Sequence, residues 1–107
     1  MGHSRCGAVS ATLDVLEGKS EAPSENVGDI VERIRPAVQE LVRPGVARDE
    51  ILPQAIRANV RASVKQLRRG SRVLEGLIGA GRLRVVGAEY ALESGEVSFF
   101  DGVEGAR

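Results

Sequence analysis

The 107 residues allow one small domain, close to the size at which a single core buries enough surface for a chain to fold alone. A hydrophobic fraction of 42% and a charged fraction of 28% are those of an ordinary globular protein, which excludes a disordered or membrane-spanning chain. Fifteen basic side chains balance fifteen acidic ones, so no net field attracts nucleic acid or anionic lipid. With one cysteine and no signal-peptide pattern, we expect a reducing, cytoplasmic location.

The first half of the chain predicts two helices joined by a loop. Apolar residues recur at helical spacing between residues 6 and 16, and Gly18 is placed to end that helix. Residues 18–26 are rich in Gly, Ser, Pro and Asn, which is typical of a surface loop. A second helix follows, which Pro36 should kink or split because proline lacks an amide donor. The apolar stripe of this second helix consists of Val27, Ile30, Val31, Ile34, Val38 and Leu41.

The second half predicts a long helix, a short helix and a β-hairpin. RPGV at 43–46 ends the preceding pattern, and Gly70 closes the long helix. Ser71 is a suitable N-cap for the short helix and Gly81 its stop. The β-prone runs RLRVVGAEYAL and EVSFF, with a turn at Ser94-Gly95, then predict a terminal hairpin. The expected apolar faces are Ile56, Val60, Val64 and Leu67 in the long helix, and Val73, Leu74, Leu77 and Ile78 in the short one.

The predicted hairpin requires further strands or a packed helix face, because two isolated strands are marginal in water. We expect the missing strands upstream of Met1, with GHSRCGA leaving the carboxyl end of a parallel strand and entering the first helix. On this interpretation the 107 residues begin in the middle of a domain whose earlier strands lie upstream of Met1.

HSRC, residues 3–6, holds the only histidine and the only cysteine. The unpaired amides and dipole of a helix N-terminus stabilise a thiolate, which would make Cys6 a competent metal ligand or nucleophile. With two residues between them, His3 and Cys6 can bind one ion at about 2.0–2.3 Å in a tetrahedral zinc site. The spacing alone also fits a half-buried thiol beside a solvated histidine, so both interpretations stay open on the residues themselves.

GHSRCGAV, residues 2–9, closely resembles the second zinc-binding segment of the β-class carbonic anhydrases, in which a strand delivers a G-H-x-x-C-G-A loop into a helix. Residues 58–100 are similar to that family's C-terminal half: a long helix bearing N-V, a short helix, a strand with G-A-x-Y and an S-G-x-V turn. The hairpin part is VVGAEYALESGEVSFF, and the resemblance is weak between residues 18 and 50. It implies an α/β fold in which residues 1–107 are the C-terminal portion of a parallel-sheet domain, mostly helical and ending in a hairpin.

The resemblance implies roles for individual residues. His3 and Cys6 would be two of the family's three protein ligands to zinc, and Gly7 would offer a backbone N–H to the substrate pocket. The implied activity is that of a zinc lyase, carbonate dehydratase, which interconverts carbon dioxide and bicarbonate. Five other matching positions are expected to serve packing and turns: Asn59, Val60, Gly87, Ala88 and Tyr90.

One segment that is typical of this family is missing from the 107 residues. Enzymes of this family carry an earlier C-x-D-x-R motif that supplies the remaining zinc cysteine and an Asp–Arg pair, and these 107 residues contain none. We therefore assign no catalytic residue in this chain and interpret Met1 as an internal methionine. Two ligands leave half of a tetrahedral site to water or to a chance carboxylate, so we expect the isolated chain to be a poor catalyst or none.

Other hypotheses stay open. The chain could be a non-catalytic remnant that binds a related subunit, or a zinc-linked homodimer that shares one metal through two His and two Cys. His3 and Cys6 could instead form a nucleophile–base pair, although no orienting third group is visible. A basic helical stripe could track phosphates, but the balanced charge favours a solvated face, so no nucleic-acid or membrane partner is expected. This stripe consists of Arg57, Arg61, Lys65, Arg68 and Arg72.

Overall fold

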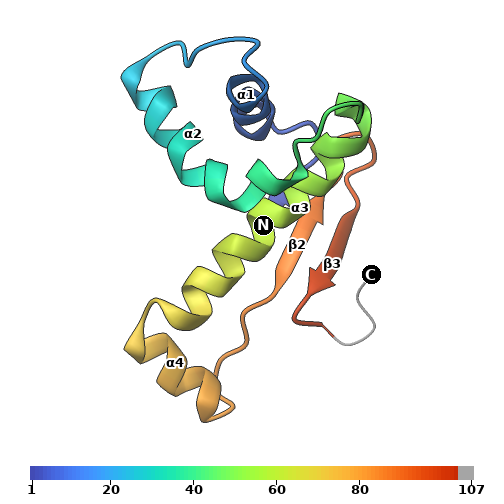
Figure 1. The fold of residues 1–107 in the computed structure, drawn as a ribbon. Coiled ribbons are helices and arrows are strands. Elements are labelled where there is room, and N and C mark those ends of the chain that lie inside the picture. Colours follow the sequence, from blue (N-terminus) through green and yellow to red (C-terminus); the bar gives the residue numbers. More distant parts are fainter. Residues whose placement is uncertain (104–107) are drawn as a thin grey trace.

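A computed structural model describes residues 1–103, so the last four residues of the expected partial domain lie outside the described part. The chain is mostly helical and ends in a hairpin, as predicted (Figure 1). The elements in chain order are β1 (Gly2–His3), α1 (Gly7–Leu16), α2 (Glu25–Val38), the 3₁₀ turn η1 (Gln39–Leu41), α3 (Arg48–Arg69), α4 (Arg72–Gly79), β2 (Gly87–Tyr90) and β3 (Val97–Asp101).

The strands form one three-stranded sheet in the order β1-β2-β3. β1 pairs with β2 in parallel, with Gly2 opposite Glu89 and His3 opposite Tyr90, and β2 pairs with β3 in an antiparallel ladder. A parallel strand leads into the first helix, as predicted for GHSRCGA, and the expectation of further strands upstream of Met1 stays a prediction. Gly2 and His3 themselves form the observed strand, because the outer edge of β2 offers them backbone partners.

The hairpin forms, but its first strand is shorter than the predicted run from Arg82 to Leu92. Only Gly87–Tyr90 pairs with β3, and the turn between the strands spans residues 91–96. The carbonyl of Val85 instead accepts a hydrogen bond of 2.8 Å from the Arg68 guanidinium of α3. The segment before β2 is therefore held by a side chain of α3. β-propensity alone does not show which backbone groups form hydrogen bonds with a neighbouring strand.

The main core lies where α1, α2 and the first half of α3 meet. It consists of Val9, Leu13, Ile34, Val38, Ile51, Ala55 and Ile56. Gly18 follows α1 with a φ of +72°, a conformation that glycine adopts without strain, so the predicted end of this helix is confirmed. α2 continues through Pro36 to Val38 and then tightens into η1, so the predicted break comes two residues later. Ile30 was predicted in the stripe but is 47% exposed.

The second core joins α3 to the hairpin. Val60 and Val64 pack against Phe100 of β3, and a Cβ built on Gly87 would lie 3.2 Å from a methyl of each valine. Gly87 and Ala88 are buried, which confirms their expected packing role. Thus α3 covers one face of the sheet, while its first half contacts α1 and α2 (Figure 1).

The end of α3 and the whole of α4 are less buried than predicted. Ser71 caps α4 by accepting a hydrogen bond from the Leu74 amide, as expected. Leu67 is 50% and Val73 72% exposed, however, and α4 has no fully buried residue. α4 packs back on α3 and lies at the far end of that helix from α1 (Figure 1). No described element covers its outer side.

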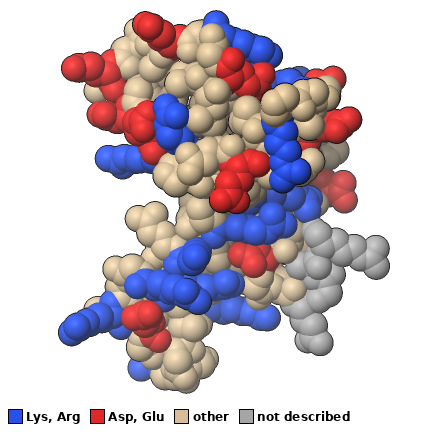
Figure 2. Space-filling model, in the orientation of Figure 1, with Lys and Arg blue, Asp and Glu red and all other residues tan. Residues whose placement is uncertain are grey.

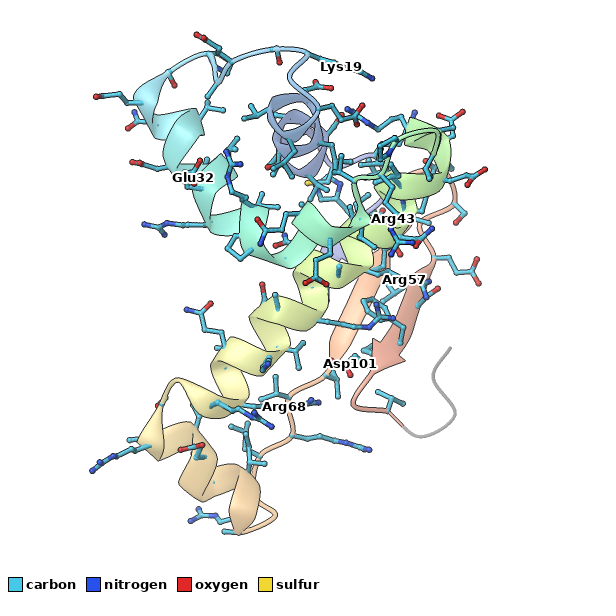
Figure 3. The ribbon with its side chains drawn as sticks, in the orientation of Figure 1. Lys19, Glu32, Arg43, Arg57, Arg68 and Asp101 are labelled. Carbon is cyan, nitrogen blue, oxygen red and sulfur yellow. The ribbon has the colours of Figure 1, made fainter. Side chains whose placement is uncertain are left out.

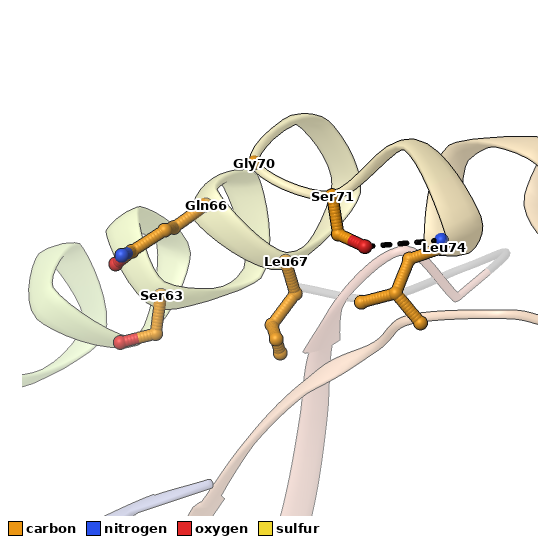
Figure 4. A pocket seen from close by; sticks show the side chains of 6 residues that line it. All are labelled: Ser63, Gln66, Leu67, Gly70, Ser71 and Leu74. Atoms are coloured by element: carbon orange, nitrogen blue, oxygen red, sulfur yellow. Dashed lines mark hydrogen bonds between the residues drawn. The ribbon is translucent and has the colours of Figure 1, made fainter.

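A groove of about 460 Å³ separates the end of α3 from α4 (Figure 4). Its lining consists of Ser63, Gln66, Leu67, Gly70, Ser71 and Leu74. None of these residues belongs to the segment that carries His3 and Cys6. Within residues 1–103, no helix has both the length and the apolar character needed to cross a membrane.

Candidate functional site

The segment from His3 to Cys6 connects β1 to α1. His3 is the last residue of β1, and Cys6 is the N-cap of α1, with φ −62° and ψ 119°. The strand–loop–helix arrangement predicted for GHSRCGA is therefore present. Its two candidate ligands lie at the carboxyl end of a parallel strand and at the N-terminus of a helix, the positions at which α/β proteins bind ligands.

The imidazole of His3 is exposed, and its Nδ1 lies 2.9 Å from the carbonyl oxygen of Ser4. A carbonyl oxygen can only accept, so Nδ1 carries the proton in this contact. In the neutral ring the lone pair is then on Nε2. A ring oriented through one nitrogen, with the other unprotonated, has the form that binds transition metals.

The thiol of Cys6 is free and half-buried against the helical core, while Gly7, the first residue of α1, is exposed. The Cys6 side chain makes no capping hydrogen bond, and the first turn of α1 contains no acidic residue. A Cβ built on Gly7 would meet no atom within 4 Å. Gly7 is thus exposed, with open space on its Cβ side.

The donor types at this loop suit zinc, which binds imidazole nitrogen and thiolate sulfur. Their number is smaller than a tetrahedral zinc site takes. Within the described part of the chain, no group of three or more His, Cys, Asp or Glu residues is close enough to hold a metal ion. The residues present fit one portion of a zinc centre, and the other donors would have to come from beyond residues 1–103 of the same copy.

The tip of the hairpin holds the loop in place through contacts that the sequence did not indicate. Ser4 Oγ donates to the Glu93 carboxylate, at 3.3 Å from Oε1 and 3.1 Å from Oε2, and accepts from the Leu92 amide at 2.9 Å. Arg5 Nε lies 3.0 Å from Glu93 Oε1. These residues belong to the two segments that carry the family resemblance, but no spacing rule connects positions so far apart in one chain.

The Glu93 carboxylate is stabilised in its charged form. Its own backbone amide, then the Ser4 hydroxyl and the Arg5 guanidinium, hold the pKa of Glu93 below its usual value. Arg5 has a φ of +53°, the left-handed region that non-glycine residues rarely adopt and that adds about 1–2 kcal/mol. A non-glycine residue keeps this conformation only where contacts with neighbouring residues stabilise it.

The basic stripe of α3 is in part a set of contacts to the hairpin (Figure 3). Arg57 Nε binds Glu89 Oε1 at 2.9 Å, and the Arg57 guanidinium lies 4.7 Å from the centre of the Phe100 ring. Arg61 stacks on the same ring at 5.1 Å. Arg68 binds the Val85 carbonyl and lies 4.0 Å from Asp101. The expected solvated face is therefore wrong for Arg57, which binds Glu89 of β2, and for Arg68, which binds the segment before β2 and lies near Asp101 of β3.

Basic side chains gather over the second half of α3 and over α4 (Figure 2). Arg61, Lys65 and Arg72 of the predicted stripe are exposed there. Acidic side chains are more frequent over α1 and α2 (Figure 2). Although the net charge is zero, basic and acidic side chains are distributed unevenly over the surface. The charge total of the sequence does not show this.

A second cluster fixes α1, the helix that Cys6 caps, to α3. Arg48 at the start of α3 binds Asp14 at 2.7 Å and Glu17 at 2.9 Å, and also reaches the Ser10 hydroxyl. Hydrogen bonds from Lys19 and then from Arg48 lower the pKa of Glu17. Burial opposes the charge of Arg48, but the bonds to Asp14 and Glu17 outweigh it and raise the pKa of Arg48. Several side-chain bonds therefore fix the orientation of α1, which begins at the Cys6 cap, relative to α3.

Comparison with known proteins gives the family. A family model described as carbonic anhydrase matches residues 1–97. The chain belongs to the carbonic anhydrase family. The carbonic anhydrase of Mycolicibacterium smegmatis is 39% identical over 98 residues, which cover 91% of this chain and 45% of that protein.

This carbonic anhydrase chain also has the fold of a solved relative, described as the β-carbonic anhydrase CcaA. The two agree with a TM-score of 0.72 at 24% identity, over 94% of this chain and 48% of the other. The resemblance seen in GHSRCGAV and in the hairpin is thus confirmed. The chain spans about half the length of the two relatives that it matches.

Proposed function

We propose that this chain carries part of the zinc centre of a carbonate dehydratase, with His3 and Cys6 as two of the metal ligands. The observation that supports this most is their placement, with an oriented imidazole ending β1 and a free thiol at the start of α1. Family membership supplies the reaction, the reversible hydration of carbon dioxide to bicarbonate. Zinc, when bound, supplies a Lewis acid that lowers the pKa of a water molecule to about 7.

The chain's own residues would then have separate tasks. His3, with Nδ1 bound to the Ser4 carbonyl, would present Nε2 to the metal, and Cys6 would present its sulfur from the helix start. The backbone N–H of Gly7 would hydrogen-bond the substrate at the exposed start of α1. The Arg48 cluster would keep the orientation of α1 relative to α3.

The zinc centre would be completed by donors from outside the described residues. Two ligands leave a metal weakly bound, and the described part of the chain brings no third ligand to them. The relatives are about twice as long as the matched region, so polypeptide of that kind is one source of the other donors. We therefore expect the 107-residue chain alone to show little or no hydration of carbon dioxide.

A chimera tests this proposal. The part of the M. smegmatis carbonic anhydrase that this chain does not match would be joined to residues 1–107, and zinc content and carbon dioxide hydration would be measured. We expect hydration by the chimera and none above background by the 107-mer. His3→Ala and Cys6→Ser should remove zinc and activity from the chimera, whereas Glu96→Gln at the exposed hairpin turn should change neither. Zinc content of the His3→Ala chimera equal to that of the parent would contradict the ligand assignment.

A zinc-linked dimer without catalytic activity is the second candidate. Its support is the donor count, since two copies would bring two imidazoles and two thiolates to one ion. Molar mass in solution with zinc and with chelator separates the candidates. A dimer that zinc forms and Cys6→Ser abolishes favours this second function, and a monomer in both conditions excludes it. The cytoplasmic location stays a prediction.

A further inference from the structure

We infer that Glu93, at the tip of the hairpin, is a positioning residue for the loop between His3 and Cys6. Its effect on the metal rests on the proposed function, whereas its effect on the loop does not. Ser4 and Arg5 are the two residues that separate the candidate ligands. One carboxylate, that of Glu93, binds the side chains of both.

The contacts of Ser4 direct the chain immediately after His3. The Ser4 amide donates to the Tyr90 carbonyl at 2.9 Å, and the Ser4 hydroxyl donates to Glu93 while it accepts from the Leu92 amide. These contacts continue the pairing of β1 with β2 beyond His3. The Ser4 carbonyl, which orients the His3 ring, is thus set by hydrogen bonds to the hairpin.

Arg5 turns the chain from the strand into the helix. Its backbone lies in the left-handed region, with a φ of +53°, and its side chain returns to Glu93 Oε1 at 3.0 Å. A non-glycine residue in this conformation needs outside contacts to keep it there. The ion pair with Glu93 is such a contact, and it lies directly before Cys6.

Because Arg5 and Glu93 are exposed, an effect on the position of the loop can be distinguished from an effect on the stability of the whole fold. The side chains of Arg5 and Glu93 are 70% and 55% exposed, and exposed ion pairs contribute little to global stability. Removal of the Glu93 carboxylate should therefore leave the fold intact and release the loop. The result is a weaker metal site in a protein of unchanged melting temperature.

Cobalt(II) titration of the full 107-residue chain, followed by its thiolate charge-transfer band, measures the effect on the metal. Glu93→Ala should weaken cobalt binding by up to about tenfold, the low end of the loss caused by removing a direct outer-shell partner, because Glu93 acts on the ligands through Ser4 and Arg5. Glu93→Gln, which keeps an acceptor for Ser4, should restore part of that affinity. Glu96→Gln removes the same charge from the same turn and should leave the affinity unchanged. Equal losses in Glu93→Ala and Glu96→Gln would overturn the inference, because they would show a general charge effect.

Amide hydrogen exchange without metal gives an independent readout. Exchange of the Ser4 and Leu92 amides, which donate to the Tyr90 carbonyl and the Ser4 hydroxyl, should accelerate in Glu93→Ala and stay unchanged in Glu96→Gln, with α3 equally protected in both. A wild-type chain that binds too little cobalt to titrate would agree with a site of only two ligands, and the exchange result would then decide the role of Glu93. Unchanged exchange of the Ser4 and Leu92 amides in Glu93→Ala would overturn the inference.

Discussion

Gly2 and Val60 are in such close contact that a Cβ atom built on Gly2 would lie 2.6 Å from a Val60 methyl. β1 therefore lies so close to α3 that any side chain at position 2 would have to displace the Val60 methyl. We expect Gly2→Ala to lower the free energy of unfolding by about 1–3 kcal/mol, because the methyl must displace packed atoms. Urea titration measures the change.

Two further variants make this prediction specific. Gly7→Ala adds the same methyl where no atom lies within 4 Å, so it should change stability by less than about 0.5 kcal/mol. Val60→Ala in the Gly2→Ala background should cost less than Val60→Ala in the wild-type chain, because it makes room for the new methyl. Additive effects would show that the contact does not exist.

Leu67 and Val64 lie one helical turn apart on α3 and differ in burial. Val64 is 4% and Leu67 50% exposed. Val64→Ala should lower the free energy of unfolding by roughly 1–3 kcal/mol through the cavity that it leaves beside Phe100. Leu67→Gln should lower it by less than about 1 kcal/mol. A larger loss for Leu67→Gln than for Val64→Ala would contradict the packing of α3 described above.

Arg48 connects α1 to α3 through three side chains of α1. Arg48→Met keeps much of the apolar stem and removes the hydrogen bonds to Asp14, Glu17 and Ser10. We expect a loss of about 1–2 kcal/mol in the free energy of unfolding, since these bonds involve charged groups of limited exposure. Arg33→Met, at an exposed position of α2, should change it by less than about 0.5 kcal/mol. Equal stability of the two variants would refute this role for Arg48.

The lowered pKa of Glu17 predicts weaker stability in acid. Below its ordinary pKa of 4.5, the unfolded chain binds a proton at Glu17 while the folded chain still does not. Stability therefore rises with pH in that window, and the contribution is complete above 4.5 and lost as pH falls through the folded value. Urea titrations from pH 3 to 7 should show a shallower acid slope for Glu17→Gln than for the wild type. Identical slopes would contradict the hydrogen bonding of Glu17 to Lys19 and Arg48.

Local patterns predicted most of the elements and the setting of the candidate ligands. Gly18, Ser71 and Gly70 ended or began helices where expected, because caps depend on a few adjacent residues. Helical periodicity identified Val60 and Val64 but also included Leu67. A stripe shows which face of a helix is apolar, and only the neighbouring elements determine how far along the helix that face is covered.

The amino-acid sequence by itself determined that the segment from His3 to Cys6 connects a strand to a helix, because that arrangement follows from short-range chemistry and from a family motif. Only the tertiary structure decided that β1 includes His3 and lies on α3, that Arg57 and Arg68 bind the hairpin, and that Ser4 and Arg5 meet Glu93. These contacts join residues far apart in the chain. Such pairs depend on how the helices and the sheet pack, and no local propensity contains that information.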